Sequence, residues 1–113
     1  MPDSSSPTQR LDRWIWCARF VKSRALAARL CTVGAVTLGD MAVRKPAYPL
    51  RVGDRLRLRL RLGSVEREIE VLALAERRGP AREARLLYAE HGLSRITEPE
   101  AAWSSLFEDE DAG

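Results

Sequence analysis

Two stretches near the start of the chain repeat apolar residues with the spacing of amphipathic helices. The first predicts a helix over about residues 10–20, with an apolar side made of Leu11, Trp14, Ile15 and Ala18. The second predicts a helix over about residues 24–33, with an apolar side made of Leu26, Leu30 and Val33. Ser23 is suited to cap the start of the second helix, and Gly34 is suited to the left-handed conformation that ends one.

Strand patterns follow the two helices. Residues 36–38 and 41–43 flank Gly39-Asp40, a dipeptide typical of a two-residue hairpin turn with glycine first. Residues 55–62 alternate arginine and leucine strictly, Gly63-Ser64 predicts a second two-residue turn, and residues 65–74 return. This register places the arginines Arg57, Arg59 and Arg61 opposite the glutamates Glu70, Glu68 and Glu66. We therefore favour a self-neutralised sheet face over a row of RNA-binding arginines.

The C-terminal part carries further helical signals. Pro80 favours the first turn of a helix that runs to about His91 and stops at Gly92. A capping box at residues 97–100 predicts a last helix. The polar start, residues 1–9, and the acidic end, residues 108–113, are expected to be disordered. The elements together predict an α+β fold, in which a two-helix unit packs on a small antiparallel sheet and a helical extension follows.

The distribution of charge is more informative than the total. The 113 residues carry a formal charge of +3, but residues 10–62 hold thirteen Lys and Arg against three acids, and residues 63–113 hold six Arg against twelve acids. A basic half joined to an acidic half is typical of a nucleic-acid-binding surface with a solubilising segment. Without a long apolar run or a signal-peptide core, we expect a cytoplasmic protein that does not bind membranes.

The cations of the two predicted helices form the candidate RNA-binding site. Unlike the arginines of the hairpin, they have no comparable row of acidic partners, and same-sign charges packed closely repel one another unless an anion binds them. The candidate residues are Arg10, Arg13, Arg19, Lys22, Ser23, Arg24, Arg29 and Lys45. The arginines and lysines would contact phosphates, and Ser23 would add a hydrogen bond.

The same stretch resembles the S4-type RNA-binding domain. The resemblance lies in RLDRW at residues 10–14, ARF at 18–20, KSR at 22–24 and GAV at 34–36. It implies two helices on a small sheet that bind structured RNA. The boundaries that we expect are a disordered segment 1–9, an S4-type domain with a long β-hairpin over 10–75, a helical extension over 76–107 and an acidic tail over 108–113.

The segment ERRGPA at residues 76–81, followed by LLY at 86–88, is similar to the heat shock protein 15 family. That resemblance covers about residues 9–95. It implies a non-catalytic protein that binds ribosomal RNA on free large ribosomal subunits still carrying a nascent chain on tRNA. The alternatives are an RNA-binding accessory subunit of an RNA-modifying enzyme and a DNA-binding nucleoid protein.

Several residues invite a chemical role and also have a structural explanation. Asp12 lies in a tripeptide like that of the catalytic aspartate of pseudouridine synthases, but an aspartate in the first turn of a helix is stabilised by the helix dipole, which we favour. Trp16 either stacks on a base or covers the C-terminal helix, and Arg77 and Arg78 either extend the RNA surface or pair with the acidic tail. His91 is expected to cap a helix end. Cys17 and Cys31 lack metal-ligand spacing, so we expect buried thiols and no metal, cofactor or catalytic site.

Overall fold

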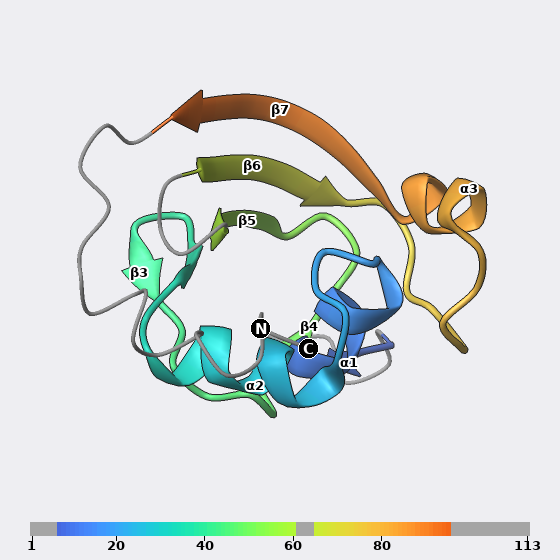
Figure 1. Cartoon of the computed structure of the whole chain (residues 1–113), viewed down its shortest axis with the longest axis horizontal. Helices are drawn as coiled ribbons and strands as arrows, with labels where there is room; N and C mark the ends of the chain where they lie inside the picture. Colours follow the sequence, from blue (N-terminus) through green and yellow to red (C-terminus); the bar gives the residue numbers. More distant parts are fainter. Residues whose placement is uncertain (1–6, 61–64, 96–113) are drawn as a thin grey trace.

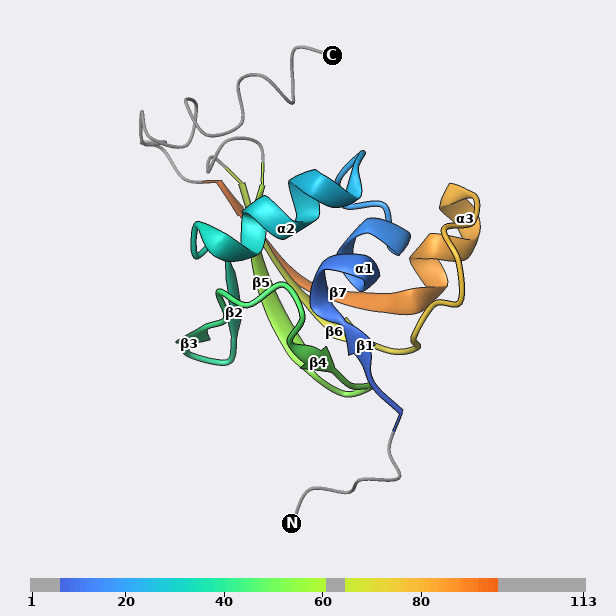
Figure 2. The same ribbon diagram turned by 90° about the horizontal axis from the view of Figure 1, so that it is seen from below.

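The structure is a computed structural model that describes residues 7–60 and 65–95. Two helices lie against a curved five-stranded antiparallel sheet with the strand order β3-β2-β5-β6-β7, and β1 and β4 form a separate two-stranded pair (Figures 1 and 2). The elements are β1 Gln9–Arg10, α1 Leu11–Cys17, α2 Arg24–Thr32, β2 Val36–Leu38, β3 Met41–Ala42, β4 Pro49–Leu50, β5 Arg55–Leu60, β6 Val65–Val71, α3 Ala81–Ala84, the 3-10 turn η1 Arg85–Leu87 and β7 Tyr88–Arg95. The predicted α+β class is confirmed.

The core lies between the two helices and the inner face of the sheet. Trp14 and Ile15 of α1 are fully buried, as are Leu58 of β5 and Ile69 of β6. The apolar sides predicted for the two helices therefore form the core, and burial of such side chains stabilises the fold by about 1.5–3 kcal/mol each.

The local signals at the helix ends and at the first hairpin are confirmed. The Leu26 backbone N–H donates to Ser23 Oγ at 3.0 Å, which caps α2. Gly34 ends this region with a φ of +83°, and Gly39 takes the first turn position with a φ of +63°. Both angles lie in the left-handed region that glycine adopts without steric cost.

The predicted register of the long hairpin is wrong by two residues. Leu60 pairs with Val65, so four residues rather than two separate the strands, and Arg57 lies opposite Glu68 instead of Glu70. A shift of two residues keeps every side chain on its predicted face, because side chains in a strand alternate with a period of two. The arginines still meet glutamates: Arg55 pairs with Glu68 at 3.0 Å.

The prediction of a helix over residues 80–91 is wrong beyond residue 87. Only α3 and η1 are helical, and residues 88–95 form β7, which pairs along β6. The backbone hydrogen bonds that β7 supplies to β6 outweigh the weak helical periodicity of these residues. His91 therefore does not cap a helix, and its Nε2 lies 2.9 Å from Glu70 Oε1.

The N-terminal boundary also differs from the prediction. Gln9, which we expected in a disordered segment, belongs to β1, where it pairs with Leu50 of β4 and is 9% exposed. The predictions for residues 1–6, for the last helix after residue 96 and for the acidic end lie outside the described residues. No helix in the described part of the chain is long and apolar enough to cross a membrane.

Candidate nucleic-acid interface

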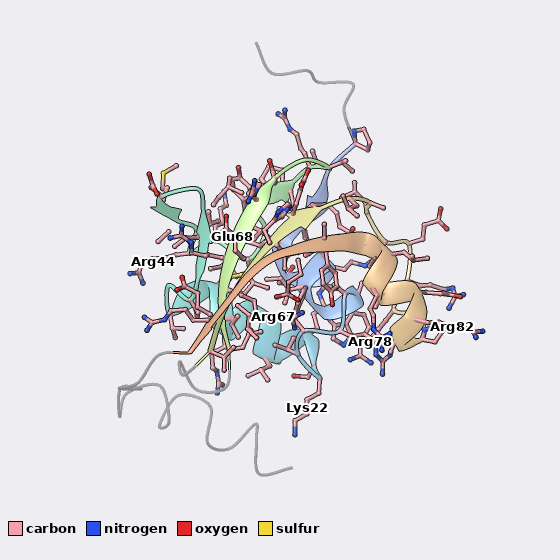
Figure 3. All side chains as sticks on the ribbon, turned by 90° about the horizontal axis from the view of Figure 1, so that it is seen from above. Lys22, Arg44, Arg67, Glu68, Arg78 and Arg82 are labelled. Atoms are coloured by element: carbon pink, nitrogen blue, oxygen red, sulfur yellow. The ribbon has the colours of Figure 1, made fainter. Side chains whose placement is uncertain are left out.

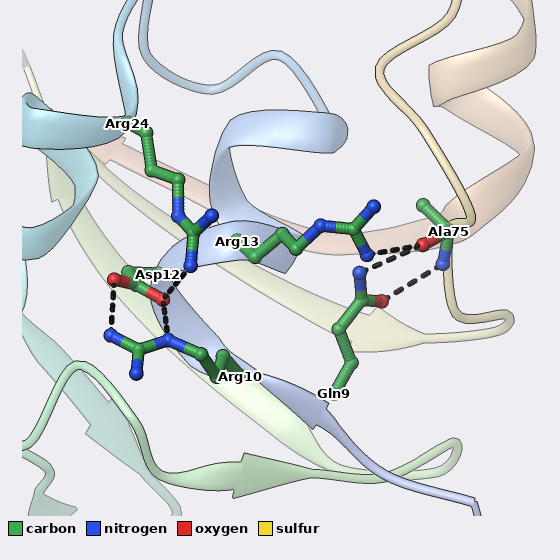
Figure 4. A network of polar contacts seen from close by, with 6 residues as sticks. All are labelled: Gln9, Arg10, Asp12, Arg13, Arg24 and Ala75. Carbon is green, nitrogen blue, oxygen red and sulfur yellow. Dashed lines mark hydrogen bonds and ion pairs between the residues drawn. The ribbon is translucent and has the colours of Figure 1, made fainter.

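Two arginines from different elements meet at one carboxylate where α1 and α2 begin. Arg10 donates from Nε and Nη2 to the two oxygens of Asp12, both at 3.0 Å. Arg24 Nη2 lies 3.7 Å from Asp12 Oδ1 (Figure 4). The Asp12 side chain is 5% exposed, whereas those of Arg10 and Arg24 are 51% and 44% exposed. We call these three residues the Asp12 cluster.

Asp12 stays ionised although it is buried. Burial alone would raise the pKa of its carboxyl group, but the hydrogen bonds and charge of Arg10, together with the charge of Arg24, hold the pKa below its ordinary value. The cluster has a net charge of +1 and presents unused N–H donors of two guanidinium groups to solvent. This corrects the expectation that the helical cations lack acidic partners. It also gives Asp12 a structural role, because Arg10 engages both of its oxygens.

Lys45 lies beside the same end of α1. The Asp12 backbone N–H donates to Pro46 O at 3.0 Å, and the Leu11 N–H donates to Tyr48 O at 2.9 Å. These bonds hold the loop that begins at Lys45 against the first turn of α1. The Lys45 side chain is exposed and makes no hydrogen bond or ion pair within residues 7–60 and 65–95. The structure thus brings together three predicted RNA-binding residues, Arg10, Arg24 and Lys45.

Two other predicted arginines face a different segment. Arg13 donates from Nη1 to Ala75 O at 3.2 Å and from Nη2 to Glu76 O, and Arg19 donates to Gly79 O at 2.9 Å. The N–H groups of arginine can donate to backbone carbonyl oxygens as well as to phosphate oxygens. Arg13 and Arg19 therefore have structural contacts that the sequence did not predict.

These two arginines belong to a larger set of donors to the same segment. Gln9 donates from Nε2 to Ala75 O at 2.7 Å and accepts from the Ala75 N–H at 2.9 Å (Figure 4). Trp14 donates from Nε1 to Ala73 O at 2.9 Å. We call the side chains of Gln9, Arg13, Trp14 and Arg19 the carbonyl clamp. The clamp holds residues 73–79 against β1 and α1, although about sixty residues of sequence separate the two parts.

The remaining predicted RNA-binding residues, Lys22, Ser23 and Arg29, lie in the α1–α2 loop and in α2. Lys22 is exposed in the loop, and Arg29 is half-buried in the last turn of α2. The Ser23 hydroxyl is engaged as the cap of α2, so its main role is structural.

Arg78 and Trp16 contact each other across this region. The Arg78 guanidinium carbon lies 5.4 Å from the centre of the Trp16 ring, in cation–π geometry, while its N–H groups donate to Trp16 O and Val21 O at 3.1 and 3.2 Å. Trp16 thus contacts the segment before α3, and Arg78 covers its ring. Arg77 pairs with Glu83 at 3.8 Å.

The cysteines offer no metal site in the described residues. Cys17 and Cys31 are buried free thiols, and no group of three or more metal-binding side chains occurs in residues 7–60 and 65–95. Burial raises the pKa of Cys17, and burial followed by the charge of Asp12 raises that of Cys31 to about 12. Neither thiol is therefore activated as a nucleophile.

Comparison with known proteins places the chain among RNA-binding proteins. The family model of the S4 domain matches residues 9–56. The heat shock protein 15 homolog of Haemophilus influenzae is 39% identical over 95 residues, covering 84% of this chain and 70% of the relative. Heat shock protein 15 of Escherichia coli K12 is 40% identical over 90 residues, covering 80% of this chain and 65% of the relative. The trimeric structure of Vibrio cholerae heat shock protein 15 has a TM-score of 0.68 and 34% identity, covering 75% of this chain and 83% of that one.

Sequence reasoning missed the partners of the candidate residues more than the residues themselves. Asp12 was recognised only as a helix-start residue, although its position two residues after Arg10 allows a local ion pair. Gln9 carried no signal, because its partner Ala75 lies 66 residues away. Arg82 and Arg85 were not singled out, since they stood in a predicted helix with acidic neighbours.

Proposed function

The chain belongs to the heat shock protein 15 family, and from this premise we propose that it binds structured ribosomal RNA on free large ribosomal subunits that carry a stalled nascent chain on tRNA, without catalysing a reaction. That it is an RNA-binding protein follows from the S4 domain and the family. The ribosomal target is the proposed part, and the resemblance of residues 76–88 to this family supports it.

The Asp12 cluster is the observation that carries the proposal. A phosphate that approaches the start of α1 would meet two guanidinium groups already held in place, with Lys45 alongside. Pre-positioned donors bind more tightly than free ones, because less side-chain entropy is lost on binding. Contacts of this kind read the shape and backbone of RNA rather than its base sequence.

A pair of double variants tests the location of the site. We expect Arg24→Gln with Lys45→Gln to weaken binding to rRNA extracted from large subunits at least tenfold. Arg55→Gln with Arg57→Gln removes the same charge from the sheet face, where glutamates face the arginines, and should change binding less than twofold. If about five phosphates are contacted, the wild-type plot of log K against log salt should have a slope of about −3.5 to −4.5. A slope near zero, or equal losses from both variants, would contradict the proposed site.

The ribosomal target needs a separate measurement. We expect the full chain to co-sediment in sucrose gradients with free large subunits, most of all with those that retain peptidyl-tRNA. Intact ribosomes, small subunits and a duplex DNA of matched length serve as competitors. A preference for intact ribosomes would contradict the proposed role on free large subunits but leave the assignment to RNA-binding proteins intact. A preference for duplex DNA would contradict binding to ribosomal RNA as the function.

A further inference from the structure

The segment after β6 carries a second set of cations. Residues 73–87, which we call the arm, run from the clamped carbonyls through α3 and η1. Residues 77–87 hold four arginines and one glutamate, which gives this part of the arm a net charge of +3. In a chain whose C-terminal half is acidic overall, this local excess of positive charge sets the arm apart.

Two of the four arginines in the arm have partners within the protein, and the side chains of the other two face solvent. Arg78 is held by Trp16 and two carbonyls, and Arg77 pairs with Glu83. The side chains of Arg82 and Arg85, by contrast, are exposed and make no hydrogen bond or ion pair within the described ranges 7–60 and 65–95. Their guanidinium groups are thus open to an external anion, unlike those of Arg55 and Arg57 on the sheet face.

The arm is fixed relative to the predicted RNA-binding helices. The carbonyl clamp joins its first residues to α1, and Arg78 joins its middle to the α1–α2 loop through Val21 O. Lys22 follows Val21 directly and precedes Arg24 of the Asp12 cluster by two residues. Figure 3 shows Lys22, Arg78 and Arg82 on one side of the molecule. The loop therefore connects the cations of the arm to those of the Asp12 cluster.

We propose that Arg82 and Arg85 form a second phosphate-binding surface, which contacts the backbone of the same RNA that the Asp12 cluster holds. This inference rests on the proposed function and extends it to the arm. Two cationic surfaces on one rigid frame are suited to a folded RNA that offers phosphates at two places at a set spacing. A flexible single strand would gain little from that spacing, because it must lose conformational freedom to reach both.

The test measures binding of rRNA from large subunits as a function of salt. We expect Arg82→Gln with Arg85→Gln to weaken binding at moderate salt about tenfold and to make the slope of log K against log salt shallower by about 1.4–1.8, the amount for two lost phosphate contacts. Arg55→Gln with Arg57→Gln is the matched control, with an equal change in charge and no expected change in slope. Circular dichroism shows whether both variants are folded.

A second readout reports proximity directly. Because Cys17 and Cys31 are fully buried, a hydroxyl-radical-generating probe can be attached to a single introduced thiol. We expect Arg85→Cys to direct discrete RNA cleavages in the complex and Arg57→Cys to direct none. Equal losses from the two double variants, or no cleavage from position 85 while the protein is bound, would overturn the inference and leave the proposed function intact. Absence of RNA binding by the wild type would overturn both.

Discussion

Replacing Gln9 tests whether the carbonyl clamp stabilises the fold. Gln9→Met keeps the length of the side chain and its apolar part but removes the hydrogen bonds of 2.7 and 2.9 Å to Ala75. Each such bond contributes about 0.5–1.5 kcal/mol net, and the partly buried Ala75 N–H would lose its partner, whereas Ala75 O would keep Arg13. We therefore expect the free energy of unfolding to fall by about 2 kcal/mol.

Urea denaturation followed by circular dichroism measures this change. In thermal denaturation, the same loss of about 2 kcal/mol corresponds to a decrease in Tm of about 8 °C for a chain of this size. Thr32→Val is the control, because it also removes a side-chain bond to a carbonyl, that of Arg29, but at an exposed site where water replaces it. Hydrogen exchange adds a local readout, since the Ala75 amide should exchange faster in Gln9→Met. If Gln9→Met and Thr32→Val have the same stability, the clamp does not stabilise the fold as argued.

Three further predictions concern single side chains. Because the pKa of Asp12 is lowered in the folded state, its ionised form stabilises the protein above the ordinary pKa of 3.8, and this contribution is lost as the pH falls through the folded value. Asp12→Asn should therefore be less stable than the wild type at pH 7, with the difference shrinking in acid denaturation titrations; a difference that stays constant with pH would contradict this. Cys17 and Cys31 should resist alkylation by iodoacetamide at pH 8 in the native state and react only on unfolding, as followed by mass spectrometry; rapid native labelling of either would contradict their burial. Arg19 has a φ of 65°, so Arg19→Gly should be more stable than Arg19→Ala by about 1 kcal/mol in urea denaturation, since both lose the guanidinium group and only alanine keeps the strain; equal stabilities would argue against that strain.

Features that depend on neighbouring residues were predictable from the sequence. The Ser23 cap, the left-handed Gly34 and the Gly39 turn each act within a few residues, so the residue types alone indicate them. The faces of β5 and β6 were also correct, because alternation survives any even shift of register. The shift itself was not predictable, since Gly63-Ser64 is compatible with a short turn and with the middle of a longer connection.

Features that depend on distant residues were not predictable. The prediction of a helix up to His91 fails because residues 88–95 pair with the free edge of β6, and periodicity within 80–91 contains no information about that edge. The same limit applies to the candidate site. Arg13 and Arg24 look alike in the sequence, yet one contacts Ala75 and the other approaches Asp12. Only the tertiary structure shows which partner each of these arginines contacts.

The position of the clamped carbonyls has a consequence for how the chain folds during synthesis. The S4 match ends at residue 56, but the indole N–H of the fully buried Trp14 finds its acceptor only at Ala73. A nascent chain that has emerged only through residue 60 would leave this donor unpaired, at a cost of about 1–3 kcal/mol if it were buried. The two-helix unit should therefore remain incompletely packed until residues 73–79 leave the exit tunnel, so that its folding is completed late and over contacts of high sequence separation.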